Sequence, residues 1–274
     1  MSNRFTKRKF KDYDELNLTS FLILIKLLQM DVRMETKFTD DGFVVLKNFL
    51  SQDEMFDLIT QVDRFITEVV PNLPPHQVFY EDKEKPESLK QIQYLFKHDQ
   101  YFHDLMVGSK FEELAAQLLQ QPVRPVNMQF FNKPAGYGRA TPAHQDGAYF
   151  MLEPNEAVTM WLALDKVDEE NGCLRYSPGS HRDGIRAHAR TSTLGFSLGL
   201  VNHSADGEVL VLADPGDLAV HHAATTHRAE GNMSATRSRK ALGFIYYSAR
   251  AKESPNKERY QADLSRELLA AGRL

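Results

Sequence analysis

The second half of the chain consists largely of short segments of β-branched and aromatic residues that alternate with Gly, Pro, Asn and Asp. These segments are Met128–Phe131, Val158–Leu164, Val209–Leu212, Leu218–His222 and Ala241–Tyr247. Many short strands separated by turn residues are typical of a β-sandwich or a β-barrel. We therefore predict a mainly β domain within residues 34–250, in which the loop-like residues 183–208 are expected to cover a site.

Helical patterns precede this β region. An Asp-Gly turn leads into a predicted buried strand, Phe43–Leu46. Ser51 and Glu54 then have the spacing of a helix capping box, which predicts a helix up to about Phe65.

Five further segments complete the expected organisation. Residues 71–88, rich in proline and charge, are predicted to form a loop, and residues 89–106 and 110–120 to be helical. Residues 1–33 are expected to be an N-terminal extension, helical or poorly ordered. Residues 251–274 are expected to form a C-terminal helical tail.

Composition narrows the class of protein. The 274 residues carry a net charge of −4 with both signs interspersed, which argues against a general electrostatic contact with nucleic acid. The single cysteine, Cys173, permits no intrachain disulfide and is expected to pack as a small core residue. No apolar stretch approaches the roughly 20 residues of a membrane span. The basic N-terminal segment contains acidic residues and no cleavage site, so we expect a cytoplasmic protein rather than a secreted one.

The first segment with candidate functional residues is Thr141-Pro142-Ala143-His144-Gln145-Asp146-Gly147. On a strand, residues two apart point to the same face, so His144 and Asp146 would present an imidazole and a carboxylate side by side. A His-x-Asp pair is common by chance. It gains weight only if a third ligand joins it.

A second histidine segment follows the turn Pro215-Gly216-Asp217 and contains His221, His222 and His227. Neighbours on a strand face opposite ways, so at most one of His221 and His222 can point inward. Two imidazoles and one carboxylate with open positions form the facial triad of non-haem iron(II) oxygenases. Such a centre leaves room for a chelating 2-oxo acid and for dioxygen.

A 2-oxo acid with a distal carboxylate also requires a cation, and the planar fork of arginine suits that carboxylate. Arg237 and Arg239 follow a turn-like Glu230-Gly231-Asn232, and a hairpin would return them beside His227. We favour Arg239, because it leads directly into the apolar strand.

Several motifs together resemble those of the phytanoyl-CoA dioxygenase family of Fe(II)/2-oxoglutarate oxygenases. The resemblance covers about residues 38–248. It is carried by Asn132-Lys133-Pro134, His144-Gln145-Asp146, Trp161-Leu162-Ala163-Leu164, Glu170-Asn171-Gly172-Cys173-Leu174, Ser177-Pro178-Gly179-Ser180-His181, Gly216-Asp217, His222 to His227, and Arg239-Lys240-Ala241. It implies a double-stranded β-helix, a jelly-roll barrel with N-terminal helices packed outside.

The resemblance also implies residue roles. His144, Asp146 and His227 match the family's iron ligands, with His222 as the weaker alternative to His227. Arg239 matches the 2-oxoglutarate arginine. Further 2-oxoglutarate contacts are expected from Lys90, Gln129 and Trp161. One extra residue between His227 and the arginine, relative to the family pattern, keeps Arg237 as a competitor.

The expected activity is therefore hydroxylation of a small-molecule substrate, anionic or acyl, with Fe(II), 2-oxoglutarate and O2, and with release of succinate and CO2. The intact Asp146 favours hydroxylation over halogenation, and desaturation or epimerisation are related outcomes. A barrel metalloprotein with another metal, or a non-catalytic binding protein of the same fold, is the alternative.

Overall fold

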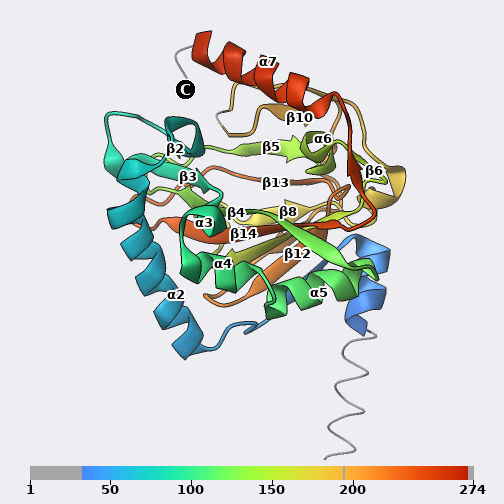
Figure 1. Cartoon of the computed structure of the whole chain (residues 1–274), viewed down its shortest axis with the longest axis horizontal. Coiled ribbons are helices and arrows are strands. Elements are labelled where there is room, and N and C mark those ends of the chain that lie inside the picture. The colour runs from blue at the N-terminus through green and yellow to red at the C-terminus, as the bar shows by residue number, and fades with distance from the viewer. Residues whose placement is uncertain (1–32, 194, 271–274) are drawn as a thin grey trace, which may run out of the picture.

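A computed structural model describes residues 33–193 and 195–270 of the chain (Figure 1). Two antiparallel β-sheets face each other, and most helices cover the outer face of the larger sheet. The described chain begins in helical residues 33–41. The expected N-terminal extension therefore lies almost entirely outside the described residues.

The larger sheet has seven strands in the order β1-β12-β7-β14-β4-β3-β2. They are β1 (Phe43–Leu46), β2 (Val78–Tyr80), β3 (Leu89–Gln93), β4 (Val123–Lys133), β7 (Ala157–Ala163), β12 (Leu218–His222) and β14 (Arg239–Ser248). The smaller sheet has the order β11-β8-β13-β5, with β5 (Thr141–His144), β8 (Leu174–Tyr176), β11 (Val209–Val211) and β13 (His227–Ala229). Two short pairs are β9 (His188–Arg190) with β10 (Leu198–Leu200), and β6 (Leu152–Glu153) with β15 (Lys252–Glu253). The five strands predicted in the β region and the strand at Phe43–Leu46 are confirmed. Their ends agree with the prediction to within two residues, except that β4 is longer than predicted.

The helices are α2 (Gln52–Arg64), α3 (Leu95–His98), α4 (Gln100–Met106), α5 (Lys110–Leu119), α6 (Gly147–Phe150) and α7 (Lys257–Ala270). The predicted capping box at Ser51 and Glu54 is present at the start of α2. Two corrections concern the segment before α5. Residues 71–88 contain β2 as well as short helical turns, and Leu89–Gln93 is strand β3 rather than helix. Four of its five residues are buried, and it pairs with β4.

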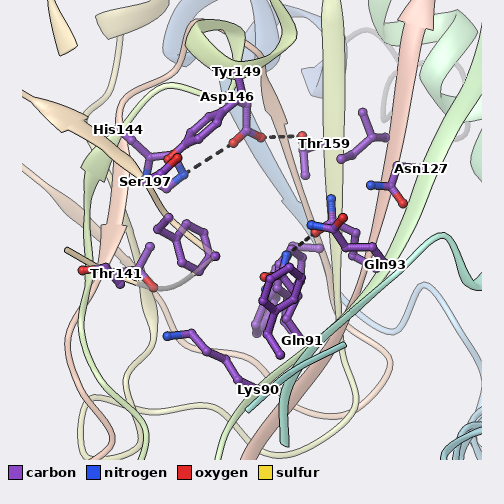
Figure 2. Close-up of a pocket in the computed structure, with 18 of the residues that line it drawn as sticks. Lys90, Gln91, Gln93, Asn127, Thr141, His144, Asp146, Tyr149, Thr159 and Ser197 are labelled. Carbon is purple, nitrogen blue, oxygen red and sulfur yellow. Dashed lines mark hydrogen bonds and ion pairs between the residues drawn. The ribbon is translucent and has the colours of Figure 1, made fainter. Parts of the chain in front are cut away.

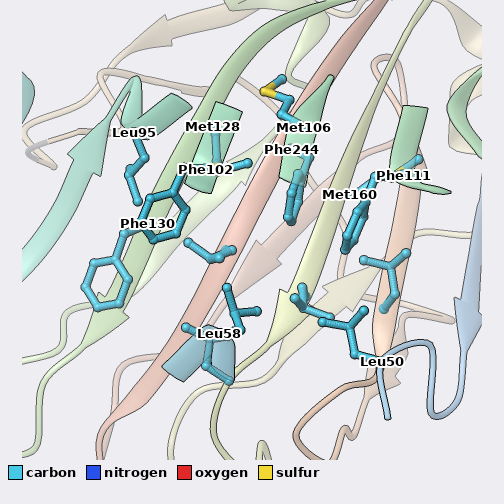
Figure 3. Close-up of a cluster of buried hydrophobic side chains, with 14 of the residues drawn as sticks. Leu50, Leu58, Leu95, Phe102, Met106, Phe111, Met128, Phe130, Met160 and Phe244 are labelled. Carbon is cyan, nitrogen blue, oxygen red and sulfur yellow. The ribbon is translucent and has the colours of Figure 1, made fainter. Parts of the chain in front are cut away.

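The main hydrophobic core lies between the helices and the outer face of the larger sheet (Figure 3). Phe111 of α5 stacks on Phe244 of β14, with ring centroids 4.1 Å apart. Met160 of β7 and Leu58 of α2 are buried in the same cluster. Burial of this face fixes the direction of alternation along each central strand. The intervening residues therefore point between the two sheets.

The space between the sheets contains a second, smaller apolar cluster and the polar residues discussed below. Cys173 is buried in that cluster, as expected. The two sheets are not joined into a closed barrel. No helix among the described residues is long and apolar enough to cross a membrane.

Candidate active site

The two predicted ligand histidines are brought together by the smaller sheet. His144 ends β5 and His227 begins β13, and the two residues are directly opposite each other in the antiparallel register. Asp146 follows β5 and immediately precedes α6. One donor atom from each of these three residues can be chosen so that all lie within 4.8 Å of one another. The Nε2 atoms of His144 and His227 lie 3.5 Å and 3.7 Å from Oδ1 of Asp146.

The backbone sets the tautomer of both histidines. Nδ1 of His144 lies 2.8 Å from the carbonyl oxygen of Pro142, and Nδ1 of His227 lies 3.1 Å from that of Thr225. A carbonyl only accepts, so each Nδ1 donates a proton and each Nε2 keeps its lone pair. Burial, and then the neighbouring His144 and His221, hold the pKa of His227 well below its ordinary value. A neutral imidazole is the form that binds a metal, so the donor set fits a divalent cation.

The other carboxylate oxygen of Asp146 is already engaged by protein groups. Oδ2 accepts a hydrogen bond from Oγ1 of Thr159 at 2.5 Å and lies 3.0 Å from Nε2 of His221. Burial opposes ionisation of Asp146, but His227, His144 and His221 outweigh it and hold its pKa well below the ordinary value. Asp146 is therefore a carboxylate with one oxygen near the Nε2 atoms of His144 and His227. Figure 2 shows its contacts with His144 and Thr159.

His221 and His222 point to opposite faces of β12, as strand geometry requires. His221 is buried between the sheets, whereas His222 lies against Phe38, with ring centroids 6.4 Å apart. His222 is therefore not brought to the cluster of His144, Asp146 and His227. The inward position of His221 beside Asp146 was missed by the sequence analysis. The alternation of β12 contained the signal, because Ala219 and His221 share the face opposite to Leu218 and Val220.

Arg239 and Arg237 occupy different environments. Arg239 begins β14, is buried, and has its guanidinium carbon 5.2 Å from the centre of the Trp161 ring. Burial lowers its pKa to about 10, so it stays charged at neutral pH. Among the described residues its Nε has no hydrogen-bond partner. Arg237 instead forms an ion pair with Asp168, with contacts of 2.8 Å and 3.0 Å, and another with Glu170.

A buried guanidinium with an unpaired N–H is costly unless an acceptor binds it. Arg239 therefore fits an anionic ligand, and Arg237 already has its counter-ions at the surface.

Asn232 fixes the hairpin between His227 and Arg239. Its side-chain amide donates to the backbone carbonyls of Lys133 and Arg237, at 2.8 Å and 2.7 Å.

The three weaker predictions also line this cavity. Trp161 lies under Arg239. Gln129 accepts a hydrogen bond from Gln91 at 2.5 Å. Lys90 is buried on β3 and forms an ion pair of 2.9 Å with Glu81. It lies on a strand, where the sequence analysis expected a helix.

A further buried cation, Lys133, was noted in the sequence only as part of a motif. Its ammonium donates to the carbonyl oxygen of Arg139, and Oγ1 of Thr141 lies 3.4 Å away. Burial, and then the nearby cations Arg239 and Lys90, hold the pKa of Lys133 well below its ordinary value. Three basic side chains, those of Lys133, Lys90 and Arg239, thus line the cavity, with Glu81 paired to Lys90.

His144, Asp146, His227, Arg239 and the lysines line one cavity of about 470 Å³ together with Trp161 and Gln129. Its wall also includes aromatic and polar side chains, among them Tyr94, Asn127, Tyr149, Tyr247, Lys257 and Tyr260. Phe196 and Ser197, from the segment expected to cover a site, also line it. Arg139 also lines the cavity, whereas Arg175, Arg182 and Arg186 do not.

Comparisons with known proteins agree with this geometry. The profile of the family described as phytanoyl-CoA dioxygenase (PhyH) matches residues 38–241. Phytanoyl-CoA dioxygenase domain-containing protein 1 of Bos taurus is 30% identical, and the match covers 76% of this chain and 87% of the relative. A probable alpha-ketoglutarate-dependent hypophosphite dioxygenase of Stutzerimonas stutzeri is 24% identical, and the match covers 80% of this chain and 79% of that protein.

Among solved structures, EvdO2 from Micromonospora carbonacea var. aurantiaca, complexed with 2-oxoglutarate, is 26% identical with a TM-score of 0.65. The match covers 81% of this chain and 92% of that one. The jelly-roll class expected from the sequence is confirmed by this similarity.

Proposed function

This chain belongs to the phytanoyl-CoA dioxygenase family of Fe(II)/2-oxoglutarate oxygenases, and we propose that His144, Asp146 and His227 hold its iron. As a member of this family it is an Fe(II)- and 2-oxoglutarate-dependent dioxygenase. We assign the distal carboxylate of 2-oxoglutarate to Arg239, with Trp161, Gln129 and Lys90 around the same ligand.

One observation carries the assignment of residues. A carboxylate oxygen and two imidazole Nε2 atoms converge at one point of the cavity, and a buried arginine with an unpaired N–H lines the same cavity. A 2-oxo acid suits both features, because one end chelates a metal and the other is a carboxylate. Arg237 is disfavoured, because Asp168 and Glu170 already neutralise it.

When bound, the iron supplies the oxidative chemistry with O2, in which 2-oxoglutarate becomes succinate and CO2 and the substrate is hydroxylated. The protein residues bind and orient 2-oxoglutarate, and they exclude water from the site. Arg239 fixes one end of 2-oxoglutarate, and the Trp161 ring supports the guanidinium. Phe196 lies over His144, with ring centroids 5.4 Å apart, and shields that side of the site.

The substrate belongs on the far side of Asp146, and we propose a small polar molecule rather than an extended acyl thioester. Residues 195–197 and α7 both contribute to the walls, which narrows the space available to a substrate. Besides Lys90 and Lys133, its lining includes tyrosine hydroxyls, the Asn127 amide and the Lys257 ammonium. Lys257 lies 3.4 Å from the Tyr247 hydroxyl and 2.8 Å from Glu253. In this proposal residues 34–250 form the dioxygenase domain, and α7 helps to select the substrate.

The ligand assignment is tested by anaerobic titration of metal-free protein with Fe(II). His144→Ala, Asp146→Ala and His227→Ala should each abolish stoichiometric binding, whereas His222→Ala, on the opposite face of β12, should retain it. Retained binding in all three ligand variants would refute the assignment. Candidate substrates are then tested by their stimulation of succinate formation, with Lys257→Ala expected to alter the KM for substrate but not for 2-oxoglutarate.

A further inference from the structure

The carboxylate of Asp146 is held by a chain of hydrogen bonds that crosses between the two sheets. Tyr176, on the smaller sheet, has its hydroxyl 2.8 Å from Nδ1 of His221, on the larger sheet. Nε2 of His221 lies 3.0 Å from Oδ2 of Asp146. Tyr176 and His221 are almost fully buried. The chain thus links a core tyrosine to one of the proposed metal ligands.

The direction of these hydrogen bonds is determined by chemistry. A carboxylate only accepts, so Nε2 of His221 carries the proton and donates to Oδ2. In the neutral ring Nδ1 is then an acceptor, and the Tyr176 hydroxyl donates to it. This tautomer is opposite to that of His144 and His227, whose Nδ1 atoms donate to backbone carbonyls. His221 therefore has no free lone pair directed at the metal position, although its ring centroid lies 4.2 Å from that of His227.

The surrounding framework holds this arrangement in place. His221 and Thr159 are opposite each other in the register of β12 and β7, and both donate to Oδ2 of Asp146. Phe43 stacks on Tyr176, with ring centroids 4.5 Å apart and an interplanar angle of 19°. Oδ2 is thus held by two donors, and Oδ1 is the oxygen that lies near the Nε2 atoms of the two ligand histidines.

We propose that His221 is a positioning residue that keeps Asp146 a one-oxygen ligand. A carboxylate can bind a metal through one oxygen or through both. If Oδ2 also bound, it would occupy one of the positions that a chelating 2-oxo acid and O2 require. The hydrogen bonds from His221 and Thr159 hold Oδ2 away and keep that position open. This inference rests on the proposed role of Asp146 as a metal ligand.

The test uses full-length protein loaded anaerobically with Co(II), because the visible spectrum of Co(II) reports its coordination number and needs no turnover. His221→Leu removes the donor, and His221→Gln provides an amide N–H in its place. We expect His221→Leu to bind Co(II) within about threefold of wild type, because Oδ2 then adds a bond to the metal. It should bind 2-oxoglutarate about tenfold or more weakly, because Oδ2 competes for a position that the 2-oxo acid requires. Its Co(II) spectrum should also change, and His221→Gln should restore both properties in large part.

Tyr176→Phe removes one buried hydroxyl and retains the packing against Phe43, so it serves as the second variant if His221→Leu does not fold. It should weaken 2-oxoglutarate binding in the same direction. Unchanged 2-oxoglutarate affinity and Co(II) spectrum in a folded His221→Leu or Tyr176→Phe protein would overturn the inference. So would a loss of Co(II) binding as complete as in His144→Ala, because His221 would then be a ligand. Failure of the wild type to bind Co(II) would instead contradict the proposed function itself.

Discussion

His144 and His227 lie directly opposite each other on β5 and β13, and their ring centroids are 4.2 Å apart. The pairing of these two strands brings together proposed ligands that are far apart in the sequence. Asp146 joins them from the turn after β5. The smaller sheet and this turn therefore provide the three proposed metal ligands, and the larger sheet contributes Arg239, Trp161 and His221 from the facing side.

The two arginines should respond differently to truncation. Arg239→Ala should weaken 2-oxoglutarate binding by roughly ten- to a hundredfold, because a hydrogen bond to a charged group contributes about 1.5–3 kcal/mol. Arg237→Ala is the matched control and should change this affinity less than about threefold, because its partners are Asp168 and Glu170. Arg239→Lys should recover only part of the affinity, because a lysine lacks the planar fork. A larger loss in Arg237→Ala than in Arg239→Ala would reverse the assignment.

Trp161 should report on 2-oxoglutarate directly. It is the single tryptophan of the chain, and its ring lies 5.2 Å from the guanidinium carbon of Arg239. Binding of a dicarboxylate to that guanidinium changes the field at the indole, so the emission should shift or be quenched on titration. The response should saturate in the wild type and require much more ligand in Arg239→Ala. An unresponsive emission in protein that binds 2-oxoglutarate by another assay would place the ligand elsewhere.

Acid should destabilise the metal-free protein through its buried histidines. Burial, and then His181, lower the pKa of His222 to about 4. The unfolded chain, with a pKa near 6.5, therefore binds more protons between these values, and stability falls as the pH drops below about 6.5. His222 alone would account for up to about 2 kcal/mol between pH 6.5 and pH 5.

His227, whose pKa is also lowered by burial, adds to this dependence with the same sign. Urea unfolding at the two pH values should therefore show a smaller pH dependence in His222→Gln than in the wild type, without abolishing it. An identical dependence in both proteins would show that His222 does not contribute.

The packing of α5 on the larger sheet should dominate the stability of the fold. Phe244 is fully buried and stacks on Phe111. Phe244→Ala should lower the free energy of unfolding by about 3–5 kcal/mol, through lost burial and the cavity left behind. Phe56→Ala is a control on α2, where the side chain is 77% exposed, and should change stability by less than about 0.5 kcal/mol. Chemical denaturation of the two variants separates these outcomes.

Residue composition made much of this architecture predictable. The segments Val158–Leu164, Leu218–His222 and Ala241–Tyr247 were placed correctly because short runs of β-branched and aromatic residues lie between turn residues. The prediction of helix at β3 was wrong because Lys90 and Gln91 are polar but buried, so this strand lacks such a run.

The site was predictable as a set of residue types, but its finer geometry was not. The choice between Arg237 and Arg239 depends on the Asn232 hydrogen bonds that shape the hairpin and on Asp168, which lies distant in the sequence. The contact of His221 with Asp146 depends on how the two sheets face each other. Such long-range relations are set by tertiary packing and not by local sequence patterns.

The most direct test of the central claim is an anaerobic titration of Fe(II)-loaded protein with 2-oxoglutarate, followed by visible absorption. We expect the charge-transfer band of the iron chelate to appear in the wild type and in Arg237→Ala. It should require much more 2-oxoglutarate in Arg239→Ala and be absent in Asp146→Ala. Failure of the band to appear in well-folded wild-type protein, or its unchanged appearance in Asp146→Ala, would contradict the assignment of iron and 2-oxoglutarate to this site.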